Sequence, residues 1–287
     1  MITVSPECLP CFLRQADLAA RAHGASGSAR SSLAARVAGM LADVPDGEVP
    51  ARVATRLHEV VREELRTDDP FREVKEREFL RYEETASRAE SLVSASPDPM
   101  ASAVWLSVFG NIMDSGIIER ESMESELGRL SGEDGPRPIP EALRERIRGA
   151  GTIGVLLDNS GEVAFDVPLL SRLSEGKRTV WIGVKGGAVI DDLTEAEARR
   201  LGLSAYGEIV SNGNRGVGTD LGLCTREFRD RIADSDLILS KGQANFETLY
   251  GNVRNAFFLF RCKCPVVSRM LRRPEGDLVV LDGDGTA

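Results

Sequence analysis

The sequence predicts an α/β protein: a three-layer, Rossmann-like, mostly parallel sheet with an all-helical N-terminal subdomain. Two observations carry this prediction. Up to about residue 150 the apolar residues recur at helical spacing, and beyond it short apolar runs alternate with helical segments. Such alternation requires crossover connections, which make the strands parallel and place helices on both faces of the sheet. We therefore predict a helical subdomain over residues 1–148 and a Rossmann-like domain over residues 149–287.

Amphipathic stripes define the helices of the first half. Leu33 and Val37 begin one stripe, and Val53, Leu57 and Val61 belong to a second. A long charged segment follows Asp69-Pro70, where proline suits a first helical turn. A more apolar helix begins near residue 100. The Gly- and Pro-rich stretch 131–140 predicts the hinge between the two parts.

Short apolar runs that end in polar or glycine-containing loops define the strands of the second half. We expect them within residues 152–161, 179–190, 204–213, 236–246, 255–267 and 277–283. Helical segments separate them at 165–176, 193–203, 223–235 and 246–253.

Composition narrows the classes of function. The 287 residues carry a formal charge of −9, which argues against a nucleic-acid backbone or an anionic membrane as partner. It does not exclude a small phosphorylated metabolite, because a local cationic pocket can exist on an acidic protein. No apolar run approaches the roughly twenty residues that span a bilayer, and the N-terminus shows no signal-peptide pattern. We expect a cytoplasmic protein.

The chain has five cysteines, an odd number that does not suggest a disulfide framework. Cys8 and Cys11 form a C-x-x-C pair with no second pair of that spacing. We interpret the pair as the start of a helix that accommodates small buried thiols. A metal, iron–sulfur or redox role is the alternative.

Polar loops follow four of the expected strands. Asp158, Asn159 and Glu162 follow the first, Asp192 lies beyond the second, and Lys241 lies at the end of a later one. A further loop with Asn212 and Gly213 follows a strand between them. In open parallel sheets ligands bind at the carboxyl ends of the strands, so these loops should converge on one edge.

The chemistry of this edge points to a metal-assisted phosphate site. Asp158, Asn159 and Asp192 offer hard oxygen ligands, which suit Mg²⁺ or Mn²⁺. Both histidines of the chain lie in the helical half. Lys241 can neutralise a phosphate as a point charge. Each loop by itself is typical of an ordinary helix N-cap, and it is their combination that indicates a site. The glycine patterns of P-loop and dinucleotide-binding proteins are absent.

The same residues resemble signature blocks of the damage-control phosphatases, the domain of unknown function 89 family. The C-x-x-C start is similar to that of its stand-alone prokaryotic subfamily. The resembling blocks run in order along the chain: CLPCFLRQA at 8–16, DPFREVKE at 69–76, GNIMDSG at 110–116, DNSGE at 158–162, KGGAVIDDLT at 185–194, SKGQANFETL at 240–249 and FRCKCPVV at 260–267.

This resemblance implies a Rossmann-like domain with a divalent metal ion, Mn²⁺, Ni²⁺ or Co²⁺, at the strand ends. It implies that small phosphomonoesters such as sugar phosphates or damaged phosphometabolites are hydrolysed. The implied metal ligands are Asp158, Asn159 and Asp192. The implied substrate-binding residues are Asn111, Asp114, Lys241 and Asn245. This chain departs from the family at Asp191, where an asparagine is usual, so its metal preference is expected to differ.

The hypothesis is therefore a metal-dependent phosphatase in which Asp158, Lys241 and Glu162 are catalytic. Asp158 acts either as a nucleophile or only as a ligand, and Glu162 either orients a water molecule or caps the following helix. A non-catalytic phosphometabolite-binding or sensing protein is one alternative, and a redox or iron–sulfur role for Cys8 and Cys11 is the other.

Overall fold

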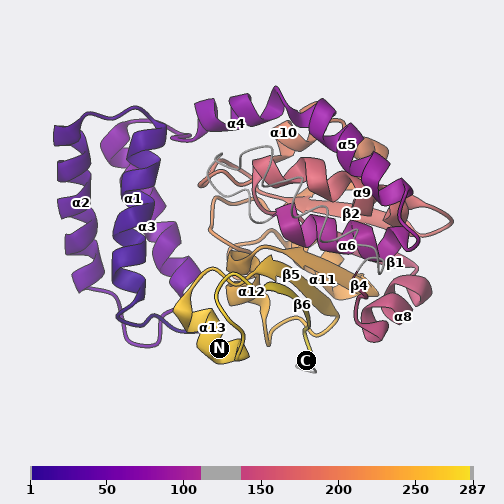
Figure 1. The fold of residues 1–287 in the computed structure, drawn as a ribbon. Helices are drawn as coiled ribbons and strands as arrows, with labels where there is room; N and C mark the ends of the chain where they lie inside the picture. The colour runs from indigo at the N-terminus through magenta and orange to yellow at the C-terminus, as the bar shows by residue number, and fades with distance from the viewer. Residues whose placement is uncertain (1, 111–136, 285–287) are drawn as a thin grey trace.

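The computed structural model describes residues 2–110 and 137–284, and its centre is a six-stranded sheet (Figure 1). The strands are β1 (Thr152–Leu156), β2 (Thr179–Val184), β3 (Glu208–Ser211), β4 (Leu237–Lys241), β5 (Ala256–Arg261) and β6 (Leu278–Asp282). Their order is β3-β2-β1-β4-β5-β6, with only β6 antiparallel to its neighbour. The predicted α/β class with a mostly parallel sheet is confirmed.

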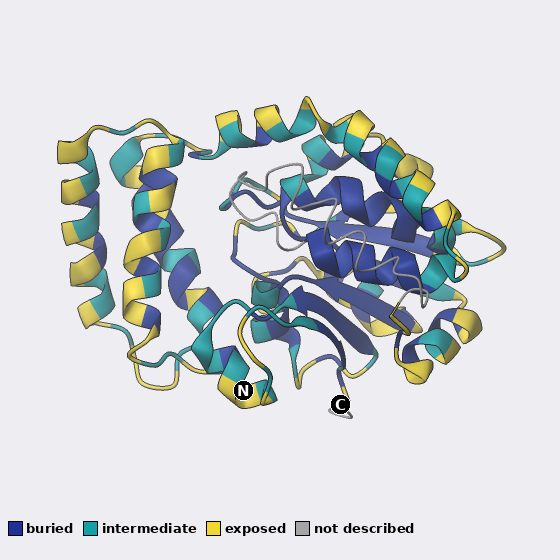
Figure 2. Ribbon diagram, in the orientation of Figure 1, coloured by how far each residue is buried: buried dark blue, intermediate teal, exposed yellow. Residues whose placement is uncertain are grey.

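Both faces of the sheet are buried, because alternate residues of each strand enter different cores. In β5, Phe257 belongs to the core shared with helix α9 (Val163–Ser174), whereas Phe258 belongs to the core shared with α11 (Arg226–Asp234) and α12 (Gln243–Leu249). Figure 2 shows the strands as dark blue, buried elements between helices whose outer sides are exposed. Two apolar faces explain why the strands appear in the sequence as continuous hydrophobic runs.

The first three helices form a bundle with its own core, to one side of the sheet in Figure 1. They are α1 (Cys8–Ala22), α2 (Gly27–Ala42) and α3 (Pro50–Leu65). Ser26 caps α2 by accepting a hydrogen bond from the Ala29 amide, and Pro50 begins α3 where a missing N–H costs nothing. Leu33 and Leu57 of the predicted stripes are buried in the bundle core.

The next helices lead from the bundle to the sheet and cover one of its faces. They are α4 (Arg72–Phe79), α5 (Tyr82–Ser94), α6 (Pro99–Gly110) and α8 (Glu141–Gly149). Helices α5 and α6 pack against α9, and α6 is buried from Ala101 to Gly110. Part of the helical half therefore completes the outer layer of the α/β sandwich. The predicted boundary at residues 148 and 149 remains a prediction.

A buried lysine ties α4 to the α/β part. The Lys75 ammonium lies 2.7 Å from Asp69 and 2.8 Å from Glu197, which belongs to α10 (Glu195–Arg200). Thr194 and Glu197 form a capping box that begins α10. The last described helix is α13 (Pro265–Leu271).

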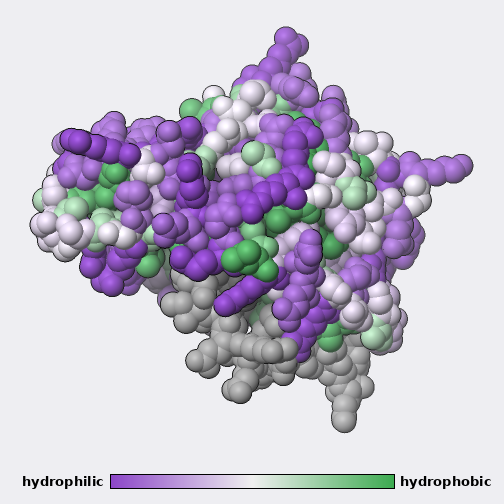
Figure 3. Space-filling model, turned by 90° about the horizontal axis from the view of Figure 1, so that it is seen from above, coloured by the Kyte–Doolittle hydropathy of each residue, from purple (hydrophilic) through white to green (hydrophobic). Residues whose placement is uncertain are grey.

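The face seen in Figure 3 is mostly hydrophilic, with small and scattered hydrophobic areas. Among the helices of residues 2–110 and 137–284, none combines the length and the apolar character needed to cross a membrane.

Candidate functional site

The candidate site lies where the strand order reverses, between β1 and β4. Ligands of open α/β sheets bind at such a reversal, beyond the carboxyl ends of the strands. A cavity of about 610 Å³ opens there, a size typical of small-molecule sites. Asp158, Asn159, Asp191 and Asp192 line it from the strand ends, and residues of α1 and α3 line it from the bundle. The cavity therefore lies between the bundle and the sheet.

Pairing between two loops brings the predicted metal ligands together. Asn159 and Asp192 are partners in an antiparallel bridge, and the amide of Leu193 donates to the carbonyl of Asp158 at 2.9 Å. The preceding Ile190 has a left-handed backbone with φ 47°, which is unfavourable for a β-branched residue. This strained turn reverses the chain after β2, so that Asp192 returns toward Asp158. The structure thus places Asp158, Asn159 and Asp192 on one wall.

Close approach of the backbone after β4 requires glycine at position 242. Gly242 has φ +83°, and a Cβ atom built on it would lie 1.9 Å from Oδ2 of Asp158. The β4 loop therefore packs directly against the Asp158 carboxylate, and no other residue type leaves room for it.

Burial and neighbouring carboxylates act on Asp158. Burial, followed by repulsion from Asp192 and Glu162, raises the pKa of Asp158 well above its usual range, and the positive charges of Lys263 and Lys185 oppose that rise. The Lys185 ammonium lies 3.3 Å from Oδ2 of Asp192 and donates to the Gly216 and Gly218 carbonyls. The wall therefore carries more negative charge than its fixed cations balance.

Lys241 lies beneath this wall and is fully buried. Its ammonium is 2.8 Å from Asp166 and 3.3 Å from Glu162, and it also donates to the Ser107 carbonyl of α6. Burial alone would lower the pKa of Lys241, but attraction to Asp166 and Glu162 outweighs it and the pKa is raised. The predicted phosphate-binding lysine is thus held in a cluster of charges behind Asp158, and its role toward phosphate stays a prediction.

Glu162 and Asn245 occupy similar inner positions. Glu162 ends a short 3₁₀ helix (Ser160–Glu162), is buried, and acts on the pKa of Asp158. The Asn245 side chain donates to the Lys241 carbonyl at 2.7 Å and accepts from the Thr219 hydroxyl at 2.7 Å. Asn245 therefore fastens the loop after β4. Two further predicted residues, Asn111 and Asp114, lie outside the described residues.

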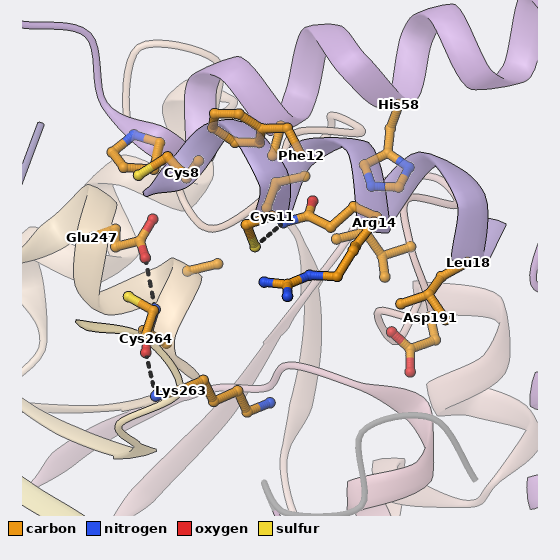
Figure 4. Close-up of a pocket in the computed structure, with 18 of the residues that line it drawn as sticks. Cys8, Cys11, Phe12, Arg14, Leu18, His58, Asp191, Glu247, Lys263 and Cys264 are labelled. Carbon is orange, nitrogen blue, oxygen red and sulfur yellow. Dashed lines mark hydrogen bonds between the residues drawn. The ribbon is translucent and has the colours of Figure 1, made fainter. Parts of the chain in front are cut away.

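Several cavity residues did not emerge from the sequence. Arg14 of α1 and Lys263, between β5 and α13, both reach into the cavity in Figure 4. Lys263 follows the end of a parallel strand, so the strand-end rule could have found it. The spacing of Arg14 from Cys11 is helical, and this could have placed both on one side of α1.

The cysteine pair also faces the cavity. Cys8 and Cys11 line it together with Cys264 (Figure 4). All five cysteines are free. The Gln15 side chain donates to Cys11 at 3.5 Å, and Gln243 donates to Cys264 at 3.4 Å. Burial raises the pKa of the Cys264 thiol, which disfavours a reactive thiolate. A structural role for Cys8 and Cys11 stays a prediction, as does the redox alternative.

The residues of the wall fit a divalent cation. Within residues 2–110 and 137–284, no cluster of three or more histidine, cysteine, aspartate or glutamate side chains could hold a metal ion. The candidate set has a different composition: two carboxylates, Asp158 and Asp192, and the carboxamide of Asn159. These are hard oxygen donors, and a divalent cation would relieve the repulsion from Asp192 and Glu162 that, together with the larger effect of burial, raises the pKa of Asp158.

A fold with a polar, carboxylate-rich site at the switch point of a parallel sheet defines the class of ligand-binding α/β proteins. The chain belongs to the damage-control phosphatase ARMT1-like family, whose domain model matches residues 4–279.

Similar proteins come from archaea. The damage-control phosphatase PH1575 of Pyrococcus horikoshii is 31% identical over 97% of both chains. A damage-control phosphatase of Archaeoglobus fulgidus is 31% identical over 80% of this chain and 82% of its own. The crystal structure of a DUF89 family protein from P. horikoshii superimposes with a TM-score of 0.86, covering 99% of this chain and all of that one at 31% identity.

Proposed function

We propose that this protein is a divalent-metal-dependent phosphatase that hydrolyses small phosphomonoesters, such as sugar phosphates or damaged phosphometabolites. The observation that carries the proposal is the gathering of Asp158, Asn159 and Asp192 on the wall of a cavity at the switch point of the sheet. Membership of the damage-control phosphatase family and the names of the similar archaeal proteins support it. The C-x-x-C start supports placement in the stand-alone prokaryotic subfamily.

In this proposal the wall holds Mn²⁺, Ni²⁺, Co²⁺ or Mg²⁺ through Asp158, Asn159 and Asp192. When bound, such an ion polarises a phosphoryl oxygen and offsets charge that develops during hydrolysis. The backbone bridge between Asn159 and Asp192 orients the metal-binding side chains before a metal ion or substrate binds. The strained turn at Ile190 keeps Asp192 in place. Pre-orientation of this kind reduces the reorganisation that catalysis requires.

Lys241 and Glu162 form the layer behind the ligands. Lys241 neutralises Glu162 and Asp166 at distances of 3.3 and 2.8 Å, so that these acids add less negative charge beside Asp158. Proton transfer or water orientation by Glu162, and contact of Lys241 with phosphate, belong to the proposal as catalytic roles. Both require the substrate to reach beneath the cavity wall.

Activity measured before and after chelation tests the proposal. The purified chain is expected to hydrolyse p-nitrophenyl phosphate and members of a sugar phosphate panel, to lose turnover after chelation, and to regain it with Mn²⁺, Co²⁺ or Ni²⁺. Asp158→Asn should weaken Mn²⁺ binding in calorimetric titration and lower turnover by about a hundredfold or more.

Asp234→Asn is the matched control, because Asp234 is exposed at the end of α11 and precedes the start of β4, whereas the site lies at the carboxyl end of that strand. It should bind Mn²⁺ and turn over like the wild type. Full activity after exhaustive chelation would refute metal dependence, and absence of turnover with every metal and substrate would favour a phosphometabolite-binding protein.

A further inference from the structure

A phosphate dianion in the cavity requires cations that can reach it. Lys241 and Lys185 do not line the cavity: each is buried and bonded to backbone carbonyl groups below the wall. Among the described residues, the cationic side chains that line the cavity are those of Arg14, Arg21 and Lys263. These three are therefore the candidates for direct contact with a substrate phosphate.

The three candidates differ in their surroundings. Arg21 forms an ion pair with Asp17 at 2.7 Å on the same helix. Arg14 is exposed and makes no ion pair or side-chain hydrogen bond with another described residue. The Lys263 backbone is fixed by the Gln243 side chain at 2.8 Å, and its ammonium extends into the cavity in Figure 4. Arg14 and Lys263 thus approach the same space from two different elements.

The balance of charge in the cavity is a second reason to assign phosphate binding to Arg14 and Lys263. Asp158, Asp191 and Asp192 supply three carboxylates to the wall. A divalent ion offsets two of their charges, so without further cations the cavity would present a net negative charge to an arriving dianion. Arg14 and Lys263 reduce the remaining excess of negative charge, to which Glu7 and Glu247 of the cavity lining also contribute. Attraction of a charged substrate depends on such a local field even when the whole protein is acidic.

We infer that Arg14 and Lys263 bind the phosphate group of the substrate, Arg14 from the helical bundle and Lys263 from the loop after β5. Arginine offers a planar pair of donors to two phosphate oxygens, and lysine acts as a point charge. Substrate binding would thereby join the bundle to the sheet. This inference rests on the proposed function, because it places the phosphate group of that substrate.

Phosphate binding by single variants tests the inference. Arg14→Gln and Lys263→Gln each remove a charge but keep a polar side chain of moderate length. Hydrogen bonds to charged groups are worth about 1.5–3 kcal/mol, so each variant should bind inorganic phosphate about ten- to a hundredfold more weakly. Isothermal titration of the Mn²⁺-loaded full chain with inorganic phosphate measures this, and the KM for p-nitrophenyl phosphate should rise in parallel. Mn²⁺ affinity and melting temperature should stay close to those of the wild type.

Arg21→Gln is the matched control, since Arg21 lies two helical turns from Arg14 on the same side of α1 and lines the same cavity. It should bind phosphate within about twofold of the wild type, because its charge is paired with Asp17. Arg14→Lys should retain part of the affinity, since it keeps the charge but loses the paired donors.

Two results would overturn the inference. One is wild-type phosphate affinity in both variants. The other is a loss of phosphate affinity in Arg21→Gln equal to theirs, which would indicate a general electrostatic attraction and no direct contact. These results are distinct from failure of the proposed function. A chain without turnover whose phosphate binding weakens in both variants would refute the phosphatase and support the cation pair. A chain that is an active phosphatase but whose phosphate affinity is unchanged by both substitutions would support the proposed function and refute the cation pair.

Discussion

Replacing Gly242 by alanine should damage the site far more than it damages the fold. Gly242 has φ +83°, and an alanine Cβ there would lie 1.9 Å from the Asp158 carboxylate. Ordinary contact begins at 3.4 Å, so the carboxylate, or the β4 loop, has to move by about 1.5 Å. Displacements of about 1 Å in a catalytic arrangement can cost a hundredfold in rate. We therefore expect kcat/KM to fall at least about a hundredfold.

The stability cost has two parts, and a second glycine separates them. A backbone with positive φ costs a non-glycine residue at least about 1–2 kcal/mol. Gly251 also has a positive φ, +81°, but no atom lies within 4 Å of its added Cβ. Gly251→Ala should therefore lose about 1–2 kcal/mol of unfolding free energy and keep its activity. Gly242→Ala should lose at least as much and also its activity.

Denaturant unfolding measures the unfolding free energy, and steady-state kinetics with added Mn²⁺ measure kcat/KM. Calorimetric titration measures Mn²⁺ affinity. The argument is refuted if Gly242→Ala turns over like Gly251→Ala, because Asp158 would then not depend on the close approach of the β4 loop. It is equally refuted if Gly242→Ala keeps wild-type Mn²⁺ affinity while losing turnover.

Three further changes test the surroundings of the site. Lys241→Met breaks a buried charge cluster and should lower the unfolding free energy by about 3–5 kcal/mol. Adding Asp166→Asn to this variant should restore a part of the loss. A Lys241→Met variant as stable in denaturant as the wild type would contradict this prediction. Burial raises the pKa of Glu247 to about 7 from 4.5, so its contribution to stability is complete below pH 4.5 and is lost as pH rises through 7. The unfolding free energy of the wild type, relative to Glu247→Gln, should therefore fall by up to about 3 kcal/mol between pH 4.5 and 8, and parallel pH curves would show that the carboxyl is not perturbed. The Cys8→Ser, Cys11→Ser double variant should keep most of its turnover and melt at a lower temperature, whereas lost turnover at an unchanged melting temperature would indicate a chemical role.

The order of helices and strands can be predicted from local patterns of the sequence. Apolar residues such as Leu33 and Val37 recur at helical spacing because one face of a helix is buried, and the run 256–260 is apolar because both faces of its strand are buried. The wall of the site was predictable for a similar reason. The carboxyl ends of parallel strands meet at one edge, so Asp158 and Asp192 had to come close to one another.

The partners of each charge were decided by the tertiary structure. Lys241 follows a strand just as a phosphate-binding lysine would, yet its ammonium meets Asp166 of α9 and a carbonyl of α6, residues distant in sequence. Arg14 lies in the first helix, and only the docking of the bundle turns it toward a cavity at the end of the sheet. Periodicity depends on which residues neighbour one another along the chain, whereas the balance of buried charge depends on which elements pack together. The sequence by itself therefore determined the architecture and the carboxylate wall of the cavity, and packing between the bundle and the sheet decided which cations face that cavity.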